Sequence, residues 1–254
     1  MTIVLLGYTG LIGKSILAKL VKDTSLNIIC VGRNRKKKPY TNPQVKYERW
    51  DFVNFSETNL TFLKKAKVII NCVGKTNNSS NSLEKINVTF VKKLIEYINI
   101  NKFKVRLIHL SSVAVYGGGT NYFRKKKIIL ENSPIKQSSL YSKSKYRADL
   151  LIKSVVKNNL NKKFSYTILR ISNAYSKDMR SNLFKYLILT LKIRIWIRYS
   201  KDTYFNFIGI EDVAQAVILS ISKLTVSKNK TYIVSDDCKQ YNFYENYRNI
   251  FKKT

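Results

Sequence analysis

Three glycines, each separated from the next by two residues, follow the first apolar run of the chain. The segment Gly7-Tyr-Thr-Gly10-Leu-Ile-Gly13 follows residues 3–6 and opens a stretch, residues 11–22, whose apolar side chains recur at helical spacing. In such a strand–turn–helix the first glycine permits the tight turn, the second lets a phosphate approach the backbone, and the third lets the helix pack on the strand. Free amides at the helix N-terminus favour an anion there. The spacing predicts a dinucleotide-binding turn formed by Gly7, Thr9, Gly10, Leu11, Ile12 and Gly13.

The second apolar run ends in Val31-Gly32-Arg33-Asn34, near the place where this kind of turn puts the adenosine ribose. A carboxylate there would bind the ribose hydroxyls and favour NAD(H), and the segment has none. Arg33, helped by Arg35 or by one of the lysines at 36–38, could instead pair with a 2′-phosphate. The segment therefore favours NADP(H), with NAD(H) as the alternative; a solvated basic loop is the explanation that needs no ligand.

A tyrosine and a lysine four residues apart stand at the start of a later amphipathic stretch, in Tyr141-Ser-Lys-Ser-Lys145. This separation places both side chains on one helix face, one turn apart. An ammonium near a phenol favours the phenolate and makes the tyrosine a better proton donor or acceptor near neutral pH. Ser112, just beyond the apolar run 105–110, could hydrogen-bond the same substrate oxygen. The pattern is common in a chain with 17 tyrosines, so its weight comes from its order with the glycine turn.

The elements that would position these residues alternate along the chain. Strands are expected at residues 2–6, 27–31, 67–71, 105–110 and 166–170, and helices at residues 11–22, 82–100 and 139–157. Continuous apolar strands between amphipathic helices predict an α/β fold, a doubly wound parallel sheet of the Rossmann type. After about residue 172 the pattern loosens, with a helix expected at 182–191, a strand at 193–199, a helix at 210–222 and a short strand at 232–234. We therefore expect a dinucleotide-binding domain, 1–171, and a small, truncated C-terminal substrate-binding region, 172–254, interleaved with the last sheet elements.

With these pieces in order, the sequence resembles the extended short-chain dehydrogenase/reductases, also called the NAD-dependent epimerase/dehydratase family. The resemblance covers nearly the whole chain. Its segments are the glycine turn, Asp51-Phe52, Asn71-Cys-Val-Gly74, Asn87, Ser111-Ser-Val-Ala-Val-Tyr-Gly117, Tyr141-Ser-Lys-Ser-Lys145, Leu169-Arg-Ile-Ser-Asn173 and Phe207-Ile-Gly-Ile-Glu-Asp-Val213.

The resemblance implies a role for each matching residue. Ser112, Tyr141 and Lys145 correspond to the catalytic set, and Lys145 also to the residue that binds the nicotinamide ribose. Asp51 and Phe52 would lie at the adenine, Val73 would line the cofactor cleft, and Ser112, Asn173 and Asn182 would contact the substrate. Asp212 is expected to tie the small region to the sheet. The chain departs from the family at Gly74-Lys75, at Tyr175-Ser176 and at Leu140, and it ends at Thr254, well short of a typical member.

Members of this family act mainly on nucleoside-diphosphate sugars, which are the expected substrate class. Because the segment at Arg33 lacks the NAD-selecting acid, the favoured reaction is reduction of a 4-keto sugar by NADPH. A 4-epimerase with bound NAD is the alternative. Dehydratases usually have an acidic pair after the catalytic serine, and Val113-Ala114 offers none. The segment 180–184 is similar to reductases and epimerases of surface-polysaccharide pathways. The family often dimerises through the helices at 82–100 and 141–157, so a homodimer is expected.

The composition bears on the remaining function classes. Lys and Arg number 47 against 15 Asp and Glu, a net charge of +32. The charge is spread over the chain, which is rich in Lys, Asn, Ile and Tyr, so compositional drift is a better explanation than nucleic-acid binding. A non-catalytic dinucleotide- or RNA-binding scaffold of the same fold remains the third hypothesis. No run of about 18 apolar residues predicts a membrane span, and no signal-peptide pattern is present, so a cytoplasmic protein is expected. The single histidine, His109, is expected to be structural, and the three scattered cysteines predict no zinc site.

Overall fold

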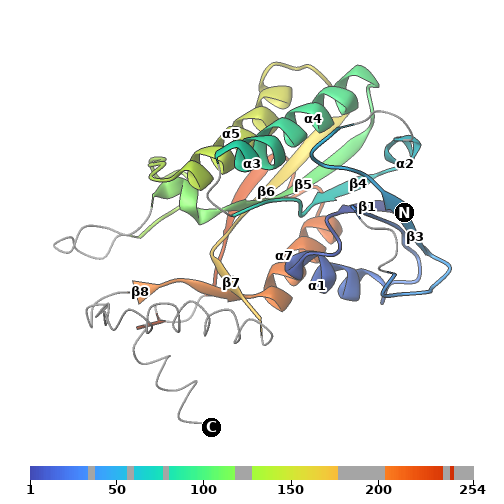
Figure 1. The fold of residues 1–254 in the computed structure, drawn as a ribbon, viewed down its shortest axis with the longest axis horizontal. Coiled ribbons are helices and arrows are strands. Elements are labelled where there is room, and N and C mark those ends of the chain that lie inside the picture. Colours follow the sequence, from blue (N-terminus) through green and yellow to red (C-terminus); the bar gives the residue numbers. More distant parts are fainter. Residues whose placement is uncertain are drawn as a thin grey trace, which may run out of the picture.

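The structure is a computed structural model that describes residues 1–33, 38–55, 60–76, 80–117, 128–176, 204–236 and 241–242. Its centre is a sheet of seven parallel strands in the order β3-β2-β1-β4-β5-β6-β10 (Figure 1). The order reverses beside β1, as in a doubly wound fold. The strands are β1 (Thr2–Leu6), β2 (Asn27–Gly32), β3 (Val45–Arg49), β4 (Val68–Asn71), β5 (Val105–Ser112), β6 (Phe164–Ile171) and β10 (Lys230–Val234).

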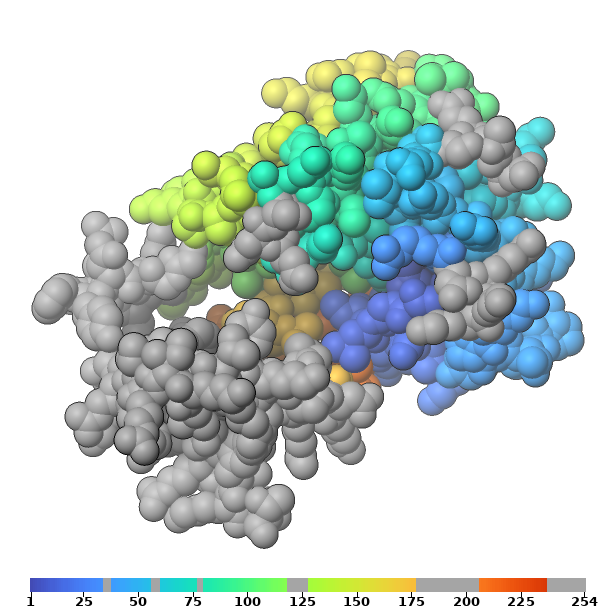
Figure 2. Space-filling view, viewed as in Figure 1, coloured from blue at the N-terminus to red at the C-terminus, as the bar shows by residue number. Residues whose placement is uncertain are grey.

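Helices cover both faces of this sheet, as the apolar strands require (Figure 1). One face packs against α4 and α5, and the other against α1 and α7. In the orientation of Figure 2, the side chains of α3 and α4 (teal to green) and of residues 38–55 (blue) form part of the outer surface. The helices are α1 (Leu11–Leu20), α2 (Thr61–Lys64), α3 (Ser80–Leu83), the π-helix η1 (Glu84–Thr89), α4 (Phe90–Ile100), the 3₁₀ turn η2 (Val113–Tyr116), α5 (Leu140–Lys157) and α7 (Ile210–Ser222).

The predicted doubly wound sheet is confirmed, with some differences in detail. The helix expected at 82–100 is three consecutive segments, because a π-helical stretch, Glu84–Thr89, separates α3 from α4. A π-turn widens the helix and often marks a functional site. It contains the buried polar residue Asn87, which periodicity does not single out. Strand β5 continues to Ser112, so the serine is the last residue of the strand rather than beyond it.

Two short sheets accompany the main one. Strand β7 (Asn173–Tyr175) pairs in parallel with β9 (Phe207–Gly209), and β8 (Tyr204–Phe205) pairs antiparallel with β11 (Tyr241–Asn242). Strand β10 joins the main sheet beside β6, so sheet elements do recur after residue 172. The helix and strand expected at 182–191 and 193–199 lie outside the described residues. Within the described part of the chain, no helix is long and apolar enough to cross a membrane.

Candidate active site

The turn between β1 and α1 has a backbone that only glycine suits at two positions. Gly7 has a φ of +83°, and a Cβ there would come within 3.1 Å of the Cys72 carbonyl carbon. A Cβ on Gly13 would stand 2.3 Å from the Gly7 carbonyl oxygen, closer than any two such atoms can approach. Strand, turn and helix are therefore in contact along their backbones, as the spacing predicts.

The N-terminus of α1 is open toward solvent at this turn. Gly10 is exposed, has the N-cap position, and makes no side-chain cap; the first turn has no acidic residue. The amides at the start of a helix lack intrahelical acceptors and attract anions. A Cβ on Gly10 would meet only the Gly7 oxygen, at 3.4 Å, so space remains on the outer side. The residues present fit the pyrophosphate of a dinucleotide.

Basic side chains stand beside the end of β2. Gly32 packs over the buried ring of Tyr8, and Arg33 is exposed. A hollow of about 270 Å³ lies next to the turn, lined by Tyr8, Thr9, Lys14, Lys38 and Pro39. None of the described residues that line this hollow is a carboxylate. Arg35 and the lysines at 36 and 37 lie outside the described residues.

The residues expected at the adenine lie just beyond β3. Asp51 is exposed, and its pKa is lowered chiefly by the Val53 amide, which donates to it at 2.9 Å; Arg33 adds a smaller effect. The Phe52 ring is in the core, edge-on to Phe90 at 5.0 Å, so only its backbone could contact a cofactor. Val73 is buried after β4, where its amide donates to Asn71.

The residues expected to be catalytic lie where β5 ends beside α5. The buried Lys145 ammonium donates to the Leu110 carbonyl oxygen at 2.8 Å, two residues before Ser112. The Ser112 hydroxyl accepts a hydrogen bond from the Ala114 amide at 3.2 Å. Tyr141 is half-buried in the first turn of α5, whose N-terminus is fixed by a capping box between Ser139 and Ser142. Strand, helix and cap thus direct these groups to one edge of the sheet.

Asn87 is a residue of this site to which the sequence analysis assigned no function. Its side chain is 2% exposed and binds both backbone groups of Lys75: the Lys75 amide donates to Oδ1 at 2.9 Å, and Nδ2 donates to the Lys75 carbonyl at 3.0 Å. Nδ2 also donates to Ser144 Oγ at 2.9 Å. Asn87 therefore joins the loop after β4 to α5, the helix that contains Tyr141 and Lys145. Gly74 in this loop leaves room for the Lys145 ammonium, 3.2 Å from where a Cβ would be.

The residues expected to contact substrate are less completely described. Asn173 is exposed in β7, and its Nδ2 donates to the Asn206 carbonyl at 3.1 Å. Asn182 lies outside the described residues, as does the segment 180–184. Asp212 lies in the first turn of α7, where its charge complements the helix dipole.

The single histidine is buried in the sheet, on the same strand as Ser112. His109 Nδ1 is 3.2 Å from Asn71 Nδ2 on the neighbouring strand, and the side chain is 1% exposed. Burial, with a smaller effect of the Lys145 ammonium, holds its pKa well below the ordinary value. Burial also raises the pKa of the Cys30 and Cys72 thiols to about 12. These groups are therefore neutral near pH 7.

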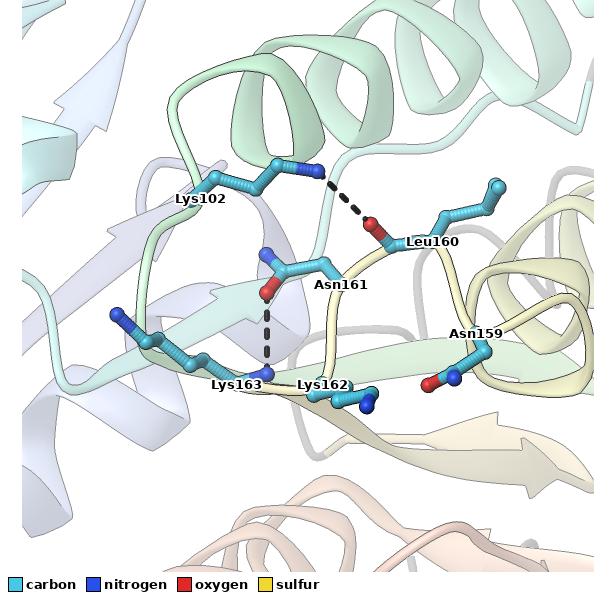
Figure 3. Close-up of a pocket in the computed structure, with 6 residues that line it drawn as sticks. All are labelled: Lys102, Asn159, Leu160, Asn161, Lys162 and Lys163. Carbon is cyan, nitrogen blue, oxygen red and sulfur yellow. Dashed lines mark hydrogen bonds between the residues drawn. The ribbon is translucent and has the colours of Figure 1, made fainter.

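A second hollow, of about 300 Å³, lies at the opposite edge of the sheet (Figure 3). It is formed by the turns that precede β5 and β6, whereas the candidate catalytic residues lie at the end of β5 and on α5. Lys102 donates to the Leu160 carbonyl across it at 3.1 Å. Its lining is Lys102, Asn159, Leu160, Asn161, Lys162 and Lys163. It is not part of the site at the glycine turn.

Solved structures share this fold. UDP-glucuronic acid 4-epimerase from Bacillus cereus, solved with NAD, has a TM-score of 0.77 and 18% identity, covering 100% of this chain and 85% of its own. dTDP-glucose 4,6-dehydratase from Bacillus anthracis, also with NAD, has a TM-score of 0.77 and 19% identity, covering 100% and 82%. UDP-N-acetylglucosamine 4-epimerase from Methanobrevibacter ruminantium, solved with UDP-N-acetylmuramic acid, has a TM-score of 0.77 and 20% identity, covering 99% and 81%.

No curated protein sequence matches the chain. Residues 3–235, however, match the NAD dependent epimerase/dehydratase family, a span from β1 beyond the end of β10. The chain therefore belongs to the NAD-dependent epimerase/dehydratase family, as its order of motifs predicts.

Proposed function

We propose that the protein is a nucleotide-sugar oxidoreductase that reduces a 4-keto nucleoside-diphosphate sugar with NADPH. The observation on which the proposal rests is the Lys145 ammonium, buried and bound to the Leu110 carbonyl between the end of β5 and the helix that contains Tyr141. Tyr141 and Lys145 lie one turn apart on α5. An ammonium held at this point supports proton transfer by a phenol on the same helix face.

In this proposal each side chain has one task. When bound, the dinucleotide supplies the hydride. Tyr141 gives its proton to the substrate oxygen, and the Ser112 hydroxyl hydrogen-bonds the same oxygen and orients it. Lys145 stabilises the phenolate left on Tyr141 and binds the nicotinamide ribose. The protein thus aligns donor and acceptor in advance, which lowers the entropic cost of the transition state.

The preference for NADPH is supported by the charges around the end of β2. Arg33 is exposed, and Lys14 and Lys38 line the hollow beside Thr9. The three cations could pair with a 2′-phosphate. Among the described residues that line the hollow there is no carboxylate to bind a free ribose diol.

The substrate class is supported by the family and by the neighbouring structures, which include a UDP-glucuronic acid 4-epimerase and a dTDP-glucose 4,6-dehydratase. We propose Asn173 and Asn182 as substrate contacts, within a substrate-binding region beginning near residue 172. We also propose a homodimer through α4 and α5. The absence of an acidic pair at Val113-Ala114 argues against dehydration.

A 4-epimerase with bound NAD is the second candidate. It is favoured by the likeness to two 4-epimerases, one of them solved with NAD. An epimerase removes and returns the same hydride, so it consumes no external dinucleotide. This difference separates the two candidates experimentally.

We would incubate the purified chain with NADPH and a panel of 4-keto nucleotide sugars and measure NADPH oxidation. The reductase should oxidise NADPH in proportion to product and should bind NADP⁺ more tightly than NAD⁺ in calorimetry. Tightly held NAD after purification, with epimerisation and no NADPH oxidation, would establish the second candidate instead.

The Tyr141→Phe variant tests the proton donor. Loss of the hydroxyl should lower kcat by about 10²–10⁴-fold and leave dinucleotide affinity nearly unchanged. Tyr146→Phe, on the same helix, is the matched control and should retain activity. An active Tyr141→Phe enzyme would refute the role of this residue.

A further inference from the structure

A buried arginine near the end of β6 joins three elements of the catalytic edge. The Arg170 side chain is 2% exposed. Its Nε and Nη2 donate to Asp149 Oδ2 on α5, at 3.1 and 3.0 Å, and its Nη1 donates to Tyr116 Oη at the end of η2, at 2.6 Å. One rigid guanidinium therefore fixes a strand, a helix and a turn relative to one another.

Each residue that Arg170 binds lies four positions after one of the proposed catalytic residues in the sequence. Asp149 comes four residues after Lys145, one helical turn along the same face of α5. Tyr116 comes four residues after Ser112, at the other end of the 3₁₀ turn that begins after the serine. In the sheet, Arg170 pairs with Ser111, the neighbour of Ser112. The guanidinium thus lies between η2, which directly follows Ser112, and α5, which contains Tyr141 and Lys145.

The same network extends to the segment that leads into α5. Tyr116 Oη donates to the Glu131 carbonyl at 3.0 Å, and Glu131 Oε1 accepts from the Ile233 amide of β10 at 2.9 Å. The Lys136 amide donates to the Val115 carbonyl at 3.1 Å. Loss of the guanidinium contacts would therefore loosen two segments: the turn at 113–117, after Ser112, and residues 130–136, before α5.

A second buried arginine, Arg106, has a different set of partners and serves as a comparison for Arg170. Arg106, 7% exposed at the start of β5, binds neutral acceptors only. Its Nε donates to Ser165 Oγ at 2.8 Å and its Nη2 to the Leu224 carbonyl at 2.8 Å; Nη1 donates to the hydroxyls of Thr167 and Ser227. It lies at the opposite end of the same strand from Ser112, and none of these acceptors belongs to α5 or η2.

We propose that Arg170, with Asp149 and Tyr116, is a positioning unit that sets the placement of the Ser112 turn relative to Tyr141 and Lys145. The unit touches neither substrate nor cofactor and acts through the elements that it joins. The expected effect on kcat rests on the proposed function. The expected coupling between Arg170 and the segments at 113–117 and 130–136 is measured by amide hydrogen exchange and requires no substrate.

The test compares Tyr116→Phe and Arg170→Lys with Arg106→Lys. Tyr116→Phe keeps the ring beside the guanidinium, 4.9 Å from its centre, and removes only the hydroxyl. Lysine at 170 cannot bind Asp149 through two nitrogens and Tyr116 through a third. Arg106→Lys is the matched control, a buried arginine of the same sheet at the far end.

Hydrogen exchange of the Lys136 and Gly117 amides should accelerate about tenfold or more in Tyr116→Phe and in Arg170→Lys, and should stay at the wild-type rate in Arg106→Lys. With a substrate in hand, both variants should lose about tenfold or more in kcat at nearly constant KM, while Arg106→Lys should lower Tm and leave kcat unchanged.

Unchanged exchange in Tyr116→Phe would overturn the proposal whatever the activity. An equal loss of kcat in Arg106→Lys would also overturn it, because the effect would then be general destabilisation. A wild-type chain that turns over no nucleotide sugar would instead remove the proposed function, and the exchange rates would still decide whether the unit couples the two segments.

Discussion

At the scale of single residues, the glycines of the dinucleotide turn have separable functions. Gly13 is buried, and a methyl group there would collide with the Gly7 carbonyl, only 2.3 Å away. Gly10 is exposed, with a φ of −72° that any residue adopts, and a methyl group there would make an ordinary contact at 3.4 Å. The fold requires a glycine at position 13 but not at position 10. We propose that the phosphates of the dinucleotide require the second glycine.

We therefore expect opposite phenotypes from two alanine substitutions. Gly13→Ala should lower the free energy of unfolding by about 1–3 kcal/mol, because the overpacked helix must move away from the strand. Gly10→Ala should leave it within about 0.5 kcal/mol of wild type, yet lower dinucleotide affinity about tenfold or more, because its methyl group occupies the approach of the phosphates.

Denaturant unfolding gives the first quantity and calorimetric titration with NADP⁺ and NAD⁺ the second. Lys19→Ala, on the same helix, is the control for affinity, since its ammonium binds Gln215 away from the turn. A Gly10→Ala protein that binds both dinucleotides like wild type would contradict the predicted use of this turn.

At the scale of elements, the sequence predicted six of the seven strands of the main sheet: five from apolar runs, and β10 as the short strand expected at 232–234. Strand β3, Val45–Arg49, was not delimited, because its alternation of buried and exposed residues includes Lys46 and Arg49. The helix at 82–100 was predicted as one element, since periodicity does not detect a π-turn. The pairing partners of Asn87 and Arg170 were missed for a simpler reason: they are 57 and 21 residues away in sequence.

A signal for those polar networks was nonetheless present. Arg106 and Arg170 lie in strands that helices cover on both faces, and an arginine in such a strand must have partners. The sequence thus indicates that such a network exists, while only the fold identifies its other members. The catalytic roles of Ser112 and Tyr141 stay predictions, because proton transfer is tested by activity and not by position in the fold.

The pair of strands β4 and β5 leads to a prediction about pH. His109 is the single histidine of the chain, and its folded-state pKa lies well below 6.5, chiefly because it is buried. Below pH 6.5 the unfolded chain therefore binds a proton that the folded chain does not. The free energy of unfolding should fall as pH decreases from 6.5 toward the folded-state pKa, by up to about 1.4 kcal/mol per pH unit.

The measurement is denaturant unfolding at several pH values between about 5 and 7, for wild type and His109→Asn. Asparagine can still accept from Asn71 Nδ2 and does not titrate. The difference in stability between the two proteins should shift in favour of the variant as pH falls. Parallel curves would show that His109 is protonated equally in the folded and unfolded chains.

At the scale of the whole molecule, the charge of +32 must be reconciled with a small-molecule enzyme. Several acids among the described residues are already paired: Asp149 with Arg170, Glu84 with Arg147, and Glu96 with Lys92. Most lysines among the described residues are exposed, and they occur on elements all around the sheet. Such a surface attracts any polyanion without selecting a sequence, because its attraction comes from counterion release.

We expect RNA binding that is strong at low salt, independent of sequence, and about 10³-fold or more weaker when salt rises from roughly 50 to 200 mM. Dinucleotide affinity should fall far less over the same range, since a few helix N–H groups and cations bind its phosphates within a shaped turn. Fluorescence anisotropy with several RNAs of different sequence, beside calorimetry with NADP⁺, measures both slopes. One RNA bound well above the others at about 200 mM salt, and displaced by the dinucleotide, would favour the scaffold hypothesis, because sequence discrimination requires contacts that diffuse charge does not provide.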